Sequence, residues 1–182
     1  MGVTNTRFEK QPHLLGELVE LRPLRDDDFT DLEAAGADPL IWKQHPVPTR
    51  HEAMVFREFF AKHLASGGAL AVINRRDGRI IGTTRFHGYD PERDEVEIGW
   101  TFLARPFWGG RYNGEMKRLM LAHAFRFVSR VVLLVHPQNV RSQRSVEKIG
   151  GVRVGSRKDA SGRDSFLYEV RRSEQRRTAV RR

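Results

Sequence analysis

The sequence predicts one α+β domain built on a mixed β-sheet, and three observations lead to this fold class. The 182 residues contain no internal repeat or linker and suffice for one sizeable hydrophobic core. Residues 94–103 alternate apolar and polar side chains, as a strand with one buried face does. Residues 131–135, Val-Val-Leu-Leu-Val, are wholly apolar, which is typical of a central strand buried on both faces.

The first part of the chain reads as one strand followed by two helices. Residues 14–24 predict the strand, and Asp26-Asp27-Asp28 predict the start of a helix that ends near Gly36. Acidic residues favour a helix N-terminus, so this run indicates a cap rather than a metal site. Residues 38–48 contain three prolines and predict a loop. Thr49 and Glu52 form a capping box for the next helix, which ends at Ser66-Gly67-Gly68.

The remaining elements follow from the same patterns. Residues 69–74 and 80–87 predict a hairpin around the turn at 76–78, and 94–103 is the next strand. Apolar residues at helical spacing predict a helix over 114–128. After the central strand at 131–135, a helix over 139–149 and a hairpin formed by 152–157 and 166–170 complete the domain.

Composition excludes several classes of protein. The chain has no cysteine, so disulfides, cysteine metal sites and a cysteine nucleophile are excluded. Its apolar runs are too short to cross a membrane, and residues 1–12 lack the apolar segment of a signal peptide. We therefore expect a cytoplasmic protein without a membrane partner. No cluster of His, Asp or Glu has metal-ligand spacing, so we expect no metal.

The positive charge is concentrated at the C-terminus. Residues 171–182 hold six Arg and one Glu, a charge of +5, which leaves +4 of the total +9 for residues 1–170. Such a like-charge run predicts a solvated, disordered tail; the alternative is a weak contact with an anion or RNA. Without interleaved aromatic residues, the tail gives little support to a nucleic-acid partner.

A glycine-rich turn gives the strongest functional indication. Residues 108–114, Trp-Gly-Gly-Arg-Tyr-Asn-Gly, enter an amphipathic helix. Small side chains let backbone N–H groups converge on an anion, and the helix dipole adds partial positive charge. The turn therefore predicts a pyrophosphate site beside the buried strand.

Four motifs together resemble the GNAT superfamily of acyl-CoA-dependent N-acetyltransferases, and most closely its branch of ribosomal-protein N-terminal acetyltransferases. The motifs are Leu-Val-Glu-Leu-Arg-Pro-Leu at 18–24, Glu-Ile-Gly-Trp at 97–100, the glycine-rich turn, and N-x-x-S-x-x-x-x-E-K-x-G at 139–150. The resemblance covers residues 14–170, leaving 1–13 as an N-terminal extension. It implies a mostly antiparallel sheet of about seven strands and about four helices, splayed between 94–103 and 131–135.

The resemblance implies that acetyl-CoA binds in this splay as the acyl donor. Backbone groups of Phe102 and Leu103 would pair with its pantetheine arm, and Asn139 would hydrogen-bond the arm, although Asn139 is equally a helix N-cap. The pyrophosphate would bind at Trp108, Gly109, Gly110, Arg111, Tyr112, Asn113 and Gly114. Arg111 and Asn113 stand where the family usually has small residues. Arg111 either contacts a phosphate or obstructs the cradle.

Acetyl transfer to an amine needs a base for the amine and an acid for the departing thiolate. Glu97 lies near the family's base position, with Glu95 and His87 as alternatives, and Ser142 matches a hydroxyl that protonates the thiolate. Each also has a structural interpretation, as an exposed carboxylate, a surface histidine or a first-turn serine. Residues that would line the acceptor's entrance are Trp42, His45, Phe56 and His87.

The leading hypothesis is therefore an acetyl-CoA-dependent N-acetyltransferase whose acceptor, a small-molecule or peptide amine, attacks directly in a ternary complex. The alternative is a non-catalytic acyl-CoA-binding or sensory module of the same fold, which Arg111, Asn113 and the absence of an unambiguous base motivate. A nucleic-acid-binding protein ranks last. The resembling family often forms dimers, so a homodimer is compatible with the sequence, which identifies no interface.

Overall fold

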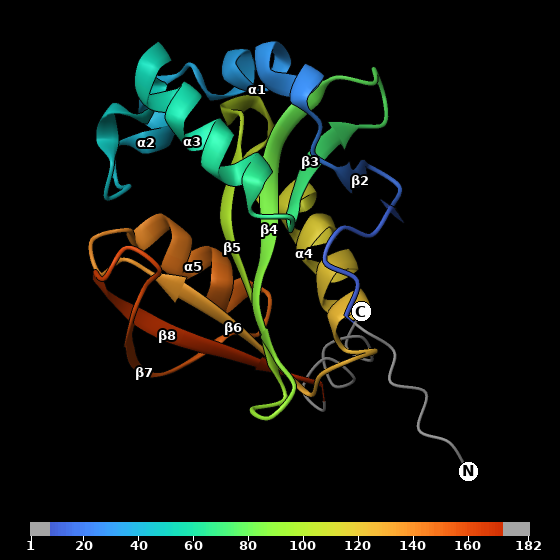
Figure 1. Ribbon diagram of the computed structural model, residues 1–182, viewed down its shortest axis with the longest axis vertical. Helices are drawn as coiled ribbons and strands as arrows, with labels where there is room; N and C mark the ends of the chain where they lie inside the picture. The colour runs from blue at the N-terminus through green and yellow to red at the C-terminus, as the bar shows by residue number, and fades with distance from the viewer. Residues whose placement is uncertain (1–7, 173–182) are drawn as a thin grey trace.

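The computed structural model describes residues 8–172, which form an eight-stranded sheet with five α-helices (Figure 1). The strands are β1 Leu14–Leu15, β2 Val19–Pro23, β3 Ala69–Asn74, β4 Ile80–Asp90, β5 Glu95–Leu103, β6 Arg130–Val135, β7 Val152–Lys158 and β8 Asp164–Arg171. The helices are α1 Phe29–Gly36, α2 Pro39–Trp42, α3 Ala53–Ala65, α4 Arg111–Ala124 and α5 Val140–Lys148. The predicted α+β class is confirmed, with somewhat more strands and helices than expected.

The sheet runs in the order β1-β2-β3-β4-β5-β6-β8-β7, and β5 with β6 is its one parallel pair among the described residues. These two strands pair only from Glu95–Arg130 to Glu97–Val132. Beyond Glu97 they diverge, as Figure 1 shows between β5 and β6. The mixed, mostly antiparallel sheet and its splay are therefore confirmed.

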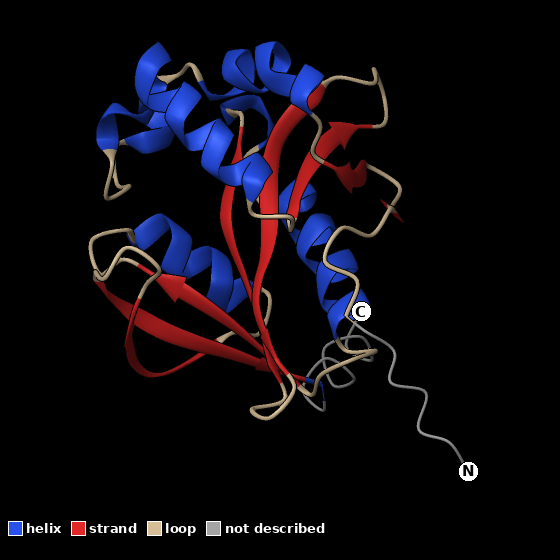
Figure 2. Cartoon of the chain, in the orientation of Figure 1, coloured by secondary structure: helices blue, strands red, loops and turns tan. Residues whose placement is uncertain are grey.

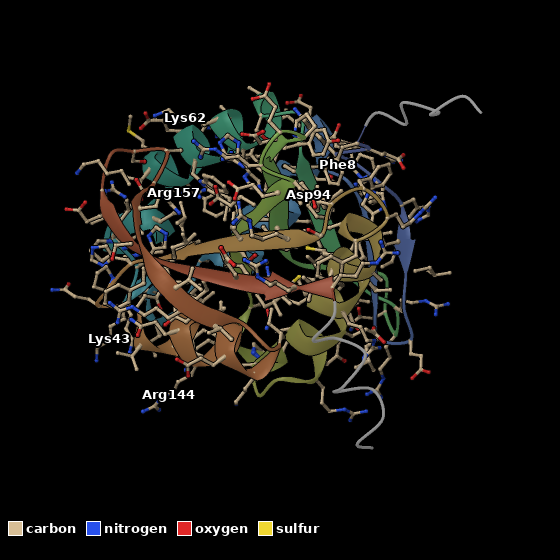
Figure 3. All side chains as sticks on the ribbon, turned by 90° about the horizontal axis from the view of Figure 1, so that it is seen from below. Phe8, Lys43, Lys62, Asp94, Arg144 and Arg157 are labelled. Carbon is tan, nitrogen blue, oxygen red and sulfur yellow. The ribbon has the colours of Figure 1, made fainter. Side chains whose placement is uncertain are left out.

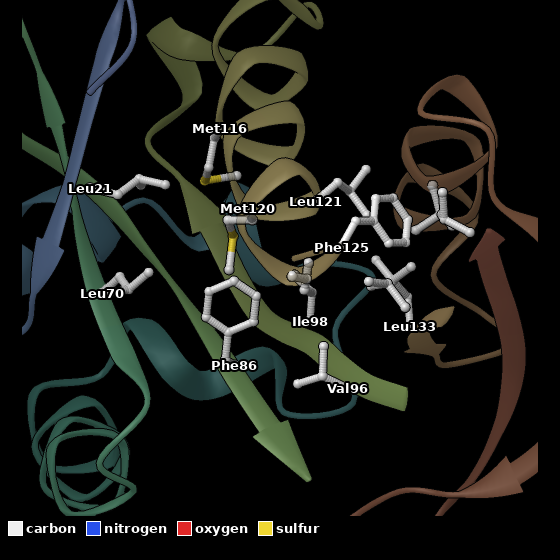
Figure 4. Packing of buried hydrophobic residues seen from close by; sticks show 14 of the residues in the cluster. Leu21, Leu70, Phe86, Val96, Ile98, Met116, Met120, Leu121, Phe125 and Leu133 are labelled. Atoms are coloured by element: carbon white, nitrogen blue, oxygen red, sulfur yellow. The ribbon is translucent and has the colours of Figure 1, made fainter. Parts of the chain in front are cut away.

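Helices cover both faces of the sheet (Figure 2). On one face, α4 and α5 pack over β2 to β6 and β8, and Figure 4 shows Met116 and Met120 of α4 against Leu21, Leu70 and Phe86. On the other face, α1, α2 and α3 enclose a second core, rich in phenylalanine, over β3 and the end of β5. The strands β4 and β5 therefore lie between two closely packed layers.

A bulge in β5 changes which side chains face which core. Thr83 of β4 pairs with Phe102 and Arg85 pairs with Gly99, so β5 has one extra residue in this interval. Trp100 adopts a left-handed φ of 50° there. Val96 and Ile98 pack with α4, whereas Phe102 packs with α1–α3. The predicted alternation of Val96, Ile98, Trp100 and Phe102 on one face is therefore wrong, because the bulge reverses the facing.

The predicted first strand over 14–24 is also wrong, because Gly16 breaks it into β1 and β2. The carboxylate of Glu115 on α4 accepts hydrogen bonds from the backbone N–H groups of Glu17, Leu18 and Val19, at 2.9, 2.7 and 2.8 Å. A Cβ at Gly16 would lie 2.6 Å from this carboxylate, so the turn requires glycine. A long-range contact, rather than local propensity, thus bends the chain here.

Three other boundaries differ from prediction. Residues 38–48 contain α2, which Pro39 starts and the Asp38 side chain caps by accepting from Leu40 N–H, rather than being all loop. The capping box at Thr49 and Glu52 is absent: Pro48–His51 is a 3₁₀ turn and Glu52 precedes α3 without a side-chain cap. Helix α4 spans Arg111–Ala124 instead of 114–128, because Gly110 already ends the turn.

Residues 8–13, which precede β1, pack onto the domain. Phe8, labelled in Figure 3, is 4% exposed and its ring lies against Phe86, Tyr89 and Phe127. The basic tail from residue 173 onward falls outside the described residues. Within the described part, none of the helices combines the length and the apolar character needed to cross a membrane.

We expect Glu115→Gln to destabilise the protein by about 2–4 kcal/mol at neutral pH, because three backbone donors lose a charged acceptor. These hydrogen bonds hold the Glu115 pKa below its ordinary 4.5, although burial alone would raise it. A carboxyl group whose pKa is lowered by folding stabilises the folded protein at pH values above its unfolded-state pKa. This stabilisation is lost as the pH falls through the folded-state pKa. Urea unfolding should therefore show the difference at pH 7 and a smaller one below pH 4.5.

Glu92→Gln, in an exposed turn, is the control and should change stability by less than about 0.5 kcal/mol. An equal effect of the two substitutions would contradict the role of Glu115.

Candidate active site

The N-terminus of α4 forms a cradle of backbone groups. Gly109 and Gly110 have φ angles of 102° and 107°, a conformation that only glycine adopts readily. No atom lies within 4 Å of a Cβ placed on either residue, so the space above them is open. The first turn has no acidic residue and no side-chain cap, so its N–H groups are available to an anion.

The side chains around this cradle are oriented by neighbouring elements. The indole N–H of Trp108 donates to the Leu103 carbonyl at 2.8 Å, and the Arg141 guanidinium lies 4.1 Å from the Trp108 ring centroid. Asn113 donates to Ser145 of α5 at 2.8 Å. Arg111 is exposed at the first position of α4. Since Arg111, Tyr112 and Asn113 are helical rather than part of the turn, their side chains project from α4.

The edge of β5 beside the splay is open from Ile98 onward, because β6 no longer pairs with it. Phe102 and Leu103 lie on this part of β5 and are buried, at 5% and 6% exposure. The Leu103 carbonyl already accepts from Trp108, so only part of the predicted pantetheine contact remains for its backbone. An extended chain that entered the splay would still meet strand-like backbone groups here.

Asn139 begins α5 and has the geometry of an N-cap. Its side-chain oxygen accepts from the Ser142 N–H at 3.1 Å, and it is 8% exposed. The N-cap interpretation is therefore confirmed, whereas contact of Asn139 with a donor stays a prediction. Ser142 occupies the first turn of α5, half-buried.

On the opposite face, a hollow of about 290 Å³ opens beside β5 and β6. Its lining includes Glu97, Glu95 and His87, together with Asp159 and Ala160 of the loop between β7 and β8. This places the predicted base and both of its alternatives in one hollow. The last hairpin forms the outer wall, as expected for the entrance of an acceptor.

Glu95 and Glu97 share a face of β5 but differ in their partners. Glu95 forms ion pairs with Arg130 and Arg157, at 2.7 and 2.8 Å. Glu97 forms none within the described residues, and burial raises its pKa to about 7 against the lowering effects of Arg85 and Arg157. A carboxyl group that titrates near neutral pH is suited to general-base catalysis, so Glu97 is the better candidate.

His87 lies opposite Glu97 on β4, with its ring 5.0 Å from that of Trp100. Its pKa is lowered, first by burial and then by the positive charges of Arg85 and Lys10. It therefore adds a neutral, polar group to the acceptor face at neutral pH.

The other predicted acceptor residues belong to α2, to α3 and to the segment between them, and none of them is among the residues that line the hollow. Trp42 is 2% exposed and donates its indole N–H to the Gly36 carbonyl at 2.8 Å, whereas Phe56 is 1% exposed within the core. His45 accepts from Val47 N–H at 2.9 Å, and its pKa falls to about 3, mainly because it is buried and beside Arg50. Phe56 thus supports the wall from behind, while His45 contributes a neutral ring.

Comparison with known proteins decides the family. Residues 19–152 match the family model for the acetyltransferase (GNAT) domain. The chain belongs to the GNAT acetyltransferase family. The resemblance found in the sequence is thereby confirmed. No curated protein matches this chain at a significant level.

Solved structures share this fold over nearly the whole chain. A putative acetyltransferase from T. thermophilus is 30% identical, with a TM-score of 0.73 over 93% of this chain and 96% of its own. A GNAT-family acetyltransferase from Bacillus anthracis is 22% identical, with a TM-score of 0.71 over 90% of this chain and 100% of its own. Mycobacterium smegmatis RimJ, solved with CoA-disulfide, is 20% identical, with a TM-score of 0.67 over 91% of this chain and 90% of its own.

Some residues of this GNAT site were missed by sequence reasoning. The sequence patterns predict only strands at 80–87 and 94–103, and so they give no role to Arg85 or to Trp100. In the structure the Arg85 guanidinium stacks on the Trp100 ring, 3.3 Å from its centroid. A charged residue within the apolar run of β4 was the available signal, but only the register shows that it faces Gly99 and the bulge.

In this GNAT domain, we expect Gly110→Ala to weaken acetyl-CoA binding about tenfold or more. A Cβ at φ 107° strains the backbone and turns the N–H groups of the cradle. Gly78→Ala is the matched control, because Gly78 has φ 72° and open space but lies in the β3–β4 turn. Calorimetric titration should show full affinity for Gly78→Ala. Similar affinities for both variants would contradict the cradle.

Proposed function

We propose that this chain transfers an acetyl group from acetyl-CoA to a primary amine by direct attack in a ternary complex. The observation that supports it most is that β5 borders both the donor side and the acceptor side. Its open edge faces the splay and the α4 cradle, while Glu97, with a pKa near 7, faces the hollow on the acceptor side. Donor and acceptor would thus meet at one strand.

The residues present fit the donor. A glycine cradle at a helix N-terminus suits a pyrophosphate, and Arg111 and Arg141 supply positive charge beside it. When bound, acetyl-CoA supplies an acetyl thioester, which is activated toward attack by an amine. The open edge of β5 would hold the extended arm of the donor.

Glu97 would make the acceptor reactive. An alkylammonium has a pKa near 10 and an α-ammonium near 8, so each must lose a proton before its nitrogen attacks. An ionised Glu97 carboxylate accepts that proton, directly or through a water. As the amine nitrogen bonds to the acetyl carbon, the thioester C–S bond would break, and Ser142, at the start of α5, is proposed to protonate the departing CoA thiolate.

Thermal unfolding with acetyl-CoA, CoA and ADP tests the donor site. At a concentration of acetyl-CoA about 100-fold above its Kd, we expect about 2.7 kcal/mol of stabilisation. This corresponds to a rise in Tm of about 5–10 °C for a domain of this size. A folded protein without any shift would contradict donor binding. A shift without thiol release, over a broad panel of amines, would favour the non-catalytic acyl-CoA-binding alternative.

We expect Glu97→Gln to lower kcat/KM by about 10²–10⁴ with little change in acetyl-CoA affinity, because the amide cannot accept the proton. For the wild type, kcat/KM should rise with pH with a midpoint of about 7, since only the ionised carboxylate acts as a base. Measuring thiol release with two amines of different pKa separates the two ionisations, because a midpoint set by Glu97 stays the same for both amines, whereas one set by the amine shifts with its pKa.

Glu58→Gln, exposed on α3 and outside the segments that line the hollow, serves as the control for Glu97→Gln. A Glu97→Gln enzyme that keeps the wild-type rate and pH profile would rule out Glu97 as the base.

A further inference from the structure

A buried guanidinium faces the acceptor side of the sheet and forms no ion pair with any residue that the structure describes. Arg85 is 7% exposed on β4, and its Nε is buried with no hydrogen-bond partner in the described part of the chain. Its guanidinium is stacked on Trp100, and the opposing Gly99 contributes no side chain, although the Glu97 carboxylate comes within 3.4 Å of where a Gly99 Cβ would be. Burying a charge is unfavourable unless an opposite charge or hydrogen bonds compensate it. Arg85 is therefore poised to bind an anion.

The nearby carboxylates are committed elsewhere. Glu95 pairs with Arg130 and Arg157, and Asp159 accepts from backbone N–H groups of its own turn. Glu97 acts on Arg85 through space, but the two form no ion pair among residues 8–172. With its raised pKa, Glu97 carries only part of a negative charge at neutral pH. The protein itself thus leaves Arg85 largely uncompensated.

A second cation extends the same surface. The Arg50 guanidinium lies 4.5 Å from the Phe59 ring centroid, and its Nε is buried without a partner in the described residues. The Nε2 of His45 lies 3.1 Å from its Nη1, but His45 is neutral at neutral pH and so cannot balance its charge.

His63 connects the two arginines. Its ring stacks on Phe59 at 5.0 Å, and burial, Arg85 and Arg50 together lower its pKa to about 3. The contacts connect the two sides: the Phe59 ring under Arg50 is the one that His63 stacks on, and His63 Nε2 lies 2.8 Å from Oγ1 of Thr83, two residues before Arg85 on β4. We call this set the cationic strip: the guanidinium groups of Arg50 and Arg85 carry its charge, and the rings of Phe59, His63 and Trp100 lie between or against them.

We propose that the acceptor amine carries an anionic group, a carboxylate or a phosphate, which Arg85 and Arg50 bind while Glu97 faces the amine. This inference rests on the proposed acetyl transfer. A guanidinium offers a planar fork of donors that matches both anions, and the aromatic rings of Trp100 and Phe59 hold the two forks in place. An amine without an anion would leave these cations desolvated and unpaired.

The experiment compares amines in matched pairs. Thiol release would be measured for α-amino acids against their amides, and for O-phosphoethanolamine against ethanolamine, at saturating acetyl-CoA. We expect the wild type to prefer one class of anionic amine at least tenfold in kcat/KM, and the two pairs separate carboxylate from phosphate. Arg85→Gln should abolish this preference, mainly through a KM raised about 10- to 100-fold for the anionic member.

Two further variants keep the result interpretable. Arg85→Lys keeps the charge but loses the fork, so it should recover part of the preference. Arg57→Gln is the matched control, because Arg57 also lies over a ring, that of Phe29, but on the exposed side of α3. It should behave as wild type. Acetylation without any preference for an anionic amine would overturn this inference and leave the proposed function standing.

A binding measurement covers the case in which no amine is acetylated. Calorimetric titration with the same compounds, with CoA present, reports occupancy without turnover. Binding of anionic amines that Arg85→Gln weakens tenfold or more supports the strip even if acetyl transfer fails. Equal binding by the wild type and Arg85→Gln, or no binding to either, overturns it.

Discussion

The arrangement of the whole site depends on the bulge in β5. The extra residue at Trp100 interrupts the regular pairing of β5 with β4. After the bulge, the side chains of β5 that would have faced one core face the other. As a result Glu97 and Phe102, an odd and an even position, both face the side of α1–α3. The same strand separates from β6 after Glu97, which opens its edge toward α4 and α5. One local irregularity thus gives β5 a donor edge and an acceptor face.

Two carboxylates on this strand show how environment assigns roles to identical side chains. Glu95 lies where the strands still pair, and arginines from β6 and β7 hold it in ion pairs. Glu97 lies two residues further, at the point of divergence, where burial outweighs the attraction of nearby arginines and raises its pKa to about 7. The raised pKa of Glu97, a residue without an ion pair among the described residues, is what suits it to acid–base chemistry.

Local patterns predicted the elements whose shape depends on nearby residues. The strand at 69–74 and the core face of the helix after the glycine turn were predicted from periodicity, and Asn139 was predicted as a cap. The failures depend on distant contacts. Glu115 bends the chain at Gly16 from almost one hundred residues away, and the bulge at Trp100 is visible only in the register with β4. The sequence therefore identified Glu97 as a candidate, but could not show that Arg85 stands beside it.

Hydrogen bonds from polar side chains around β5 connect the donor side of the site with the acceptor side. Lys117 of α4 is buried, which lowers its pKa to about 7, and it donates to Thr101 in the bulge at 2.7 Å. Trp108, beside the cradle, donates to the last residue of the strand, Leu103. The helix whose N-terminus forms the cradle is therefore bonded to the bulge that orients the acceptor face. Because packed layers shift as units rather than deform, the donor cradle and the acceptor groups keep a fixed relation across β5.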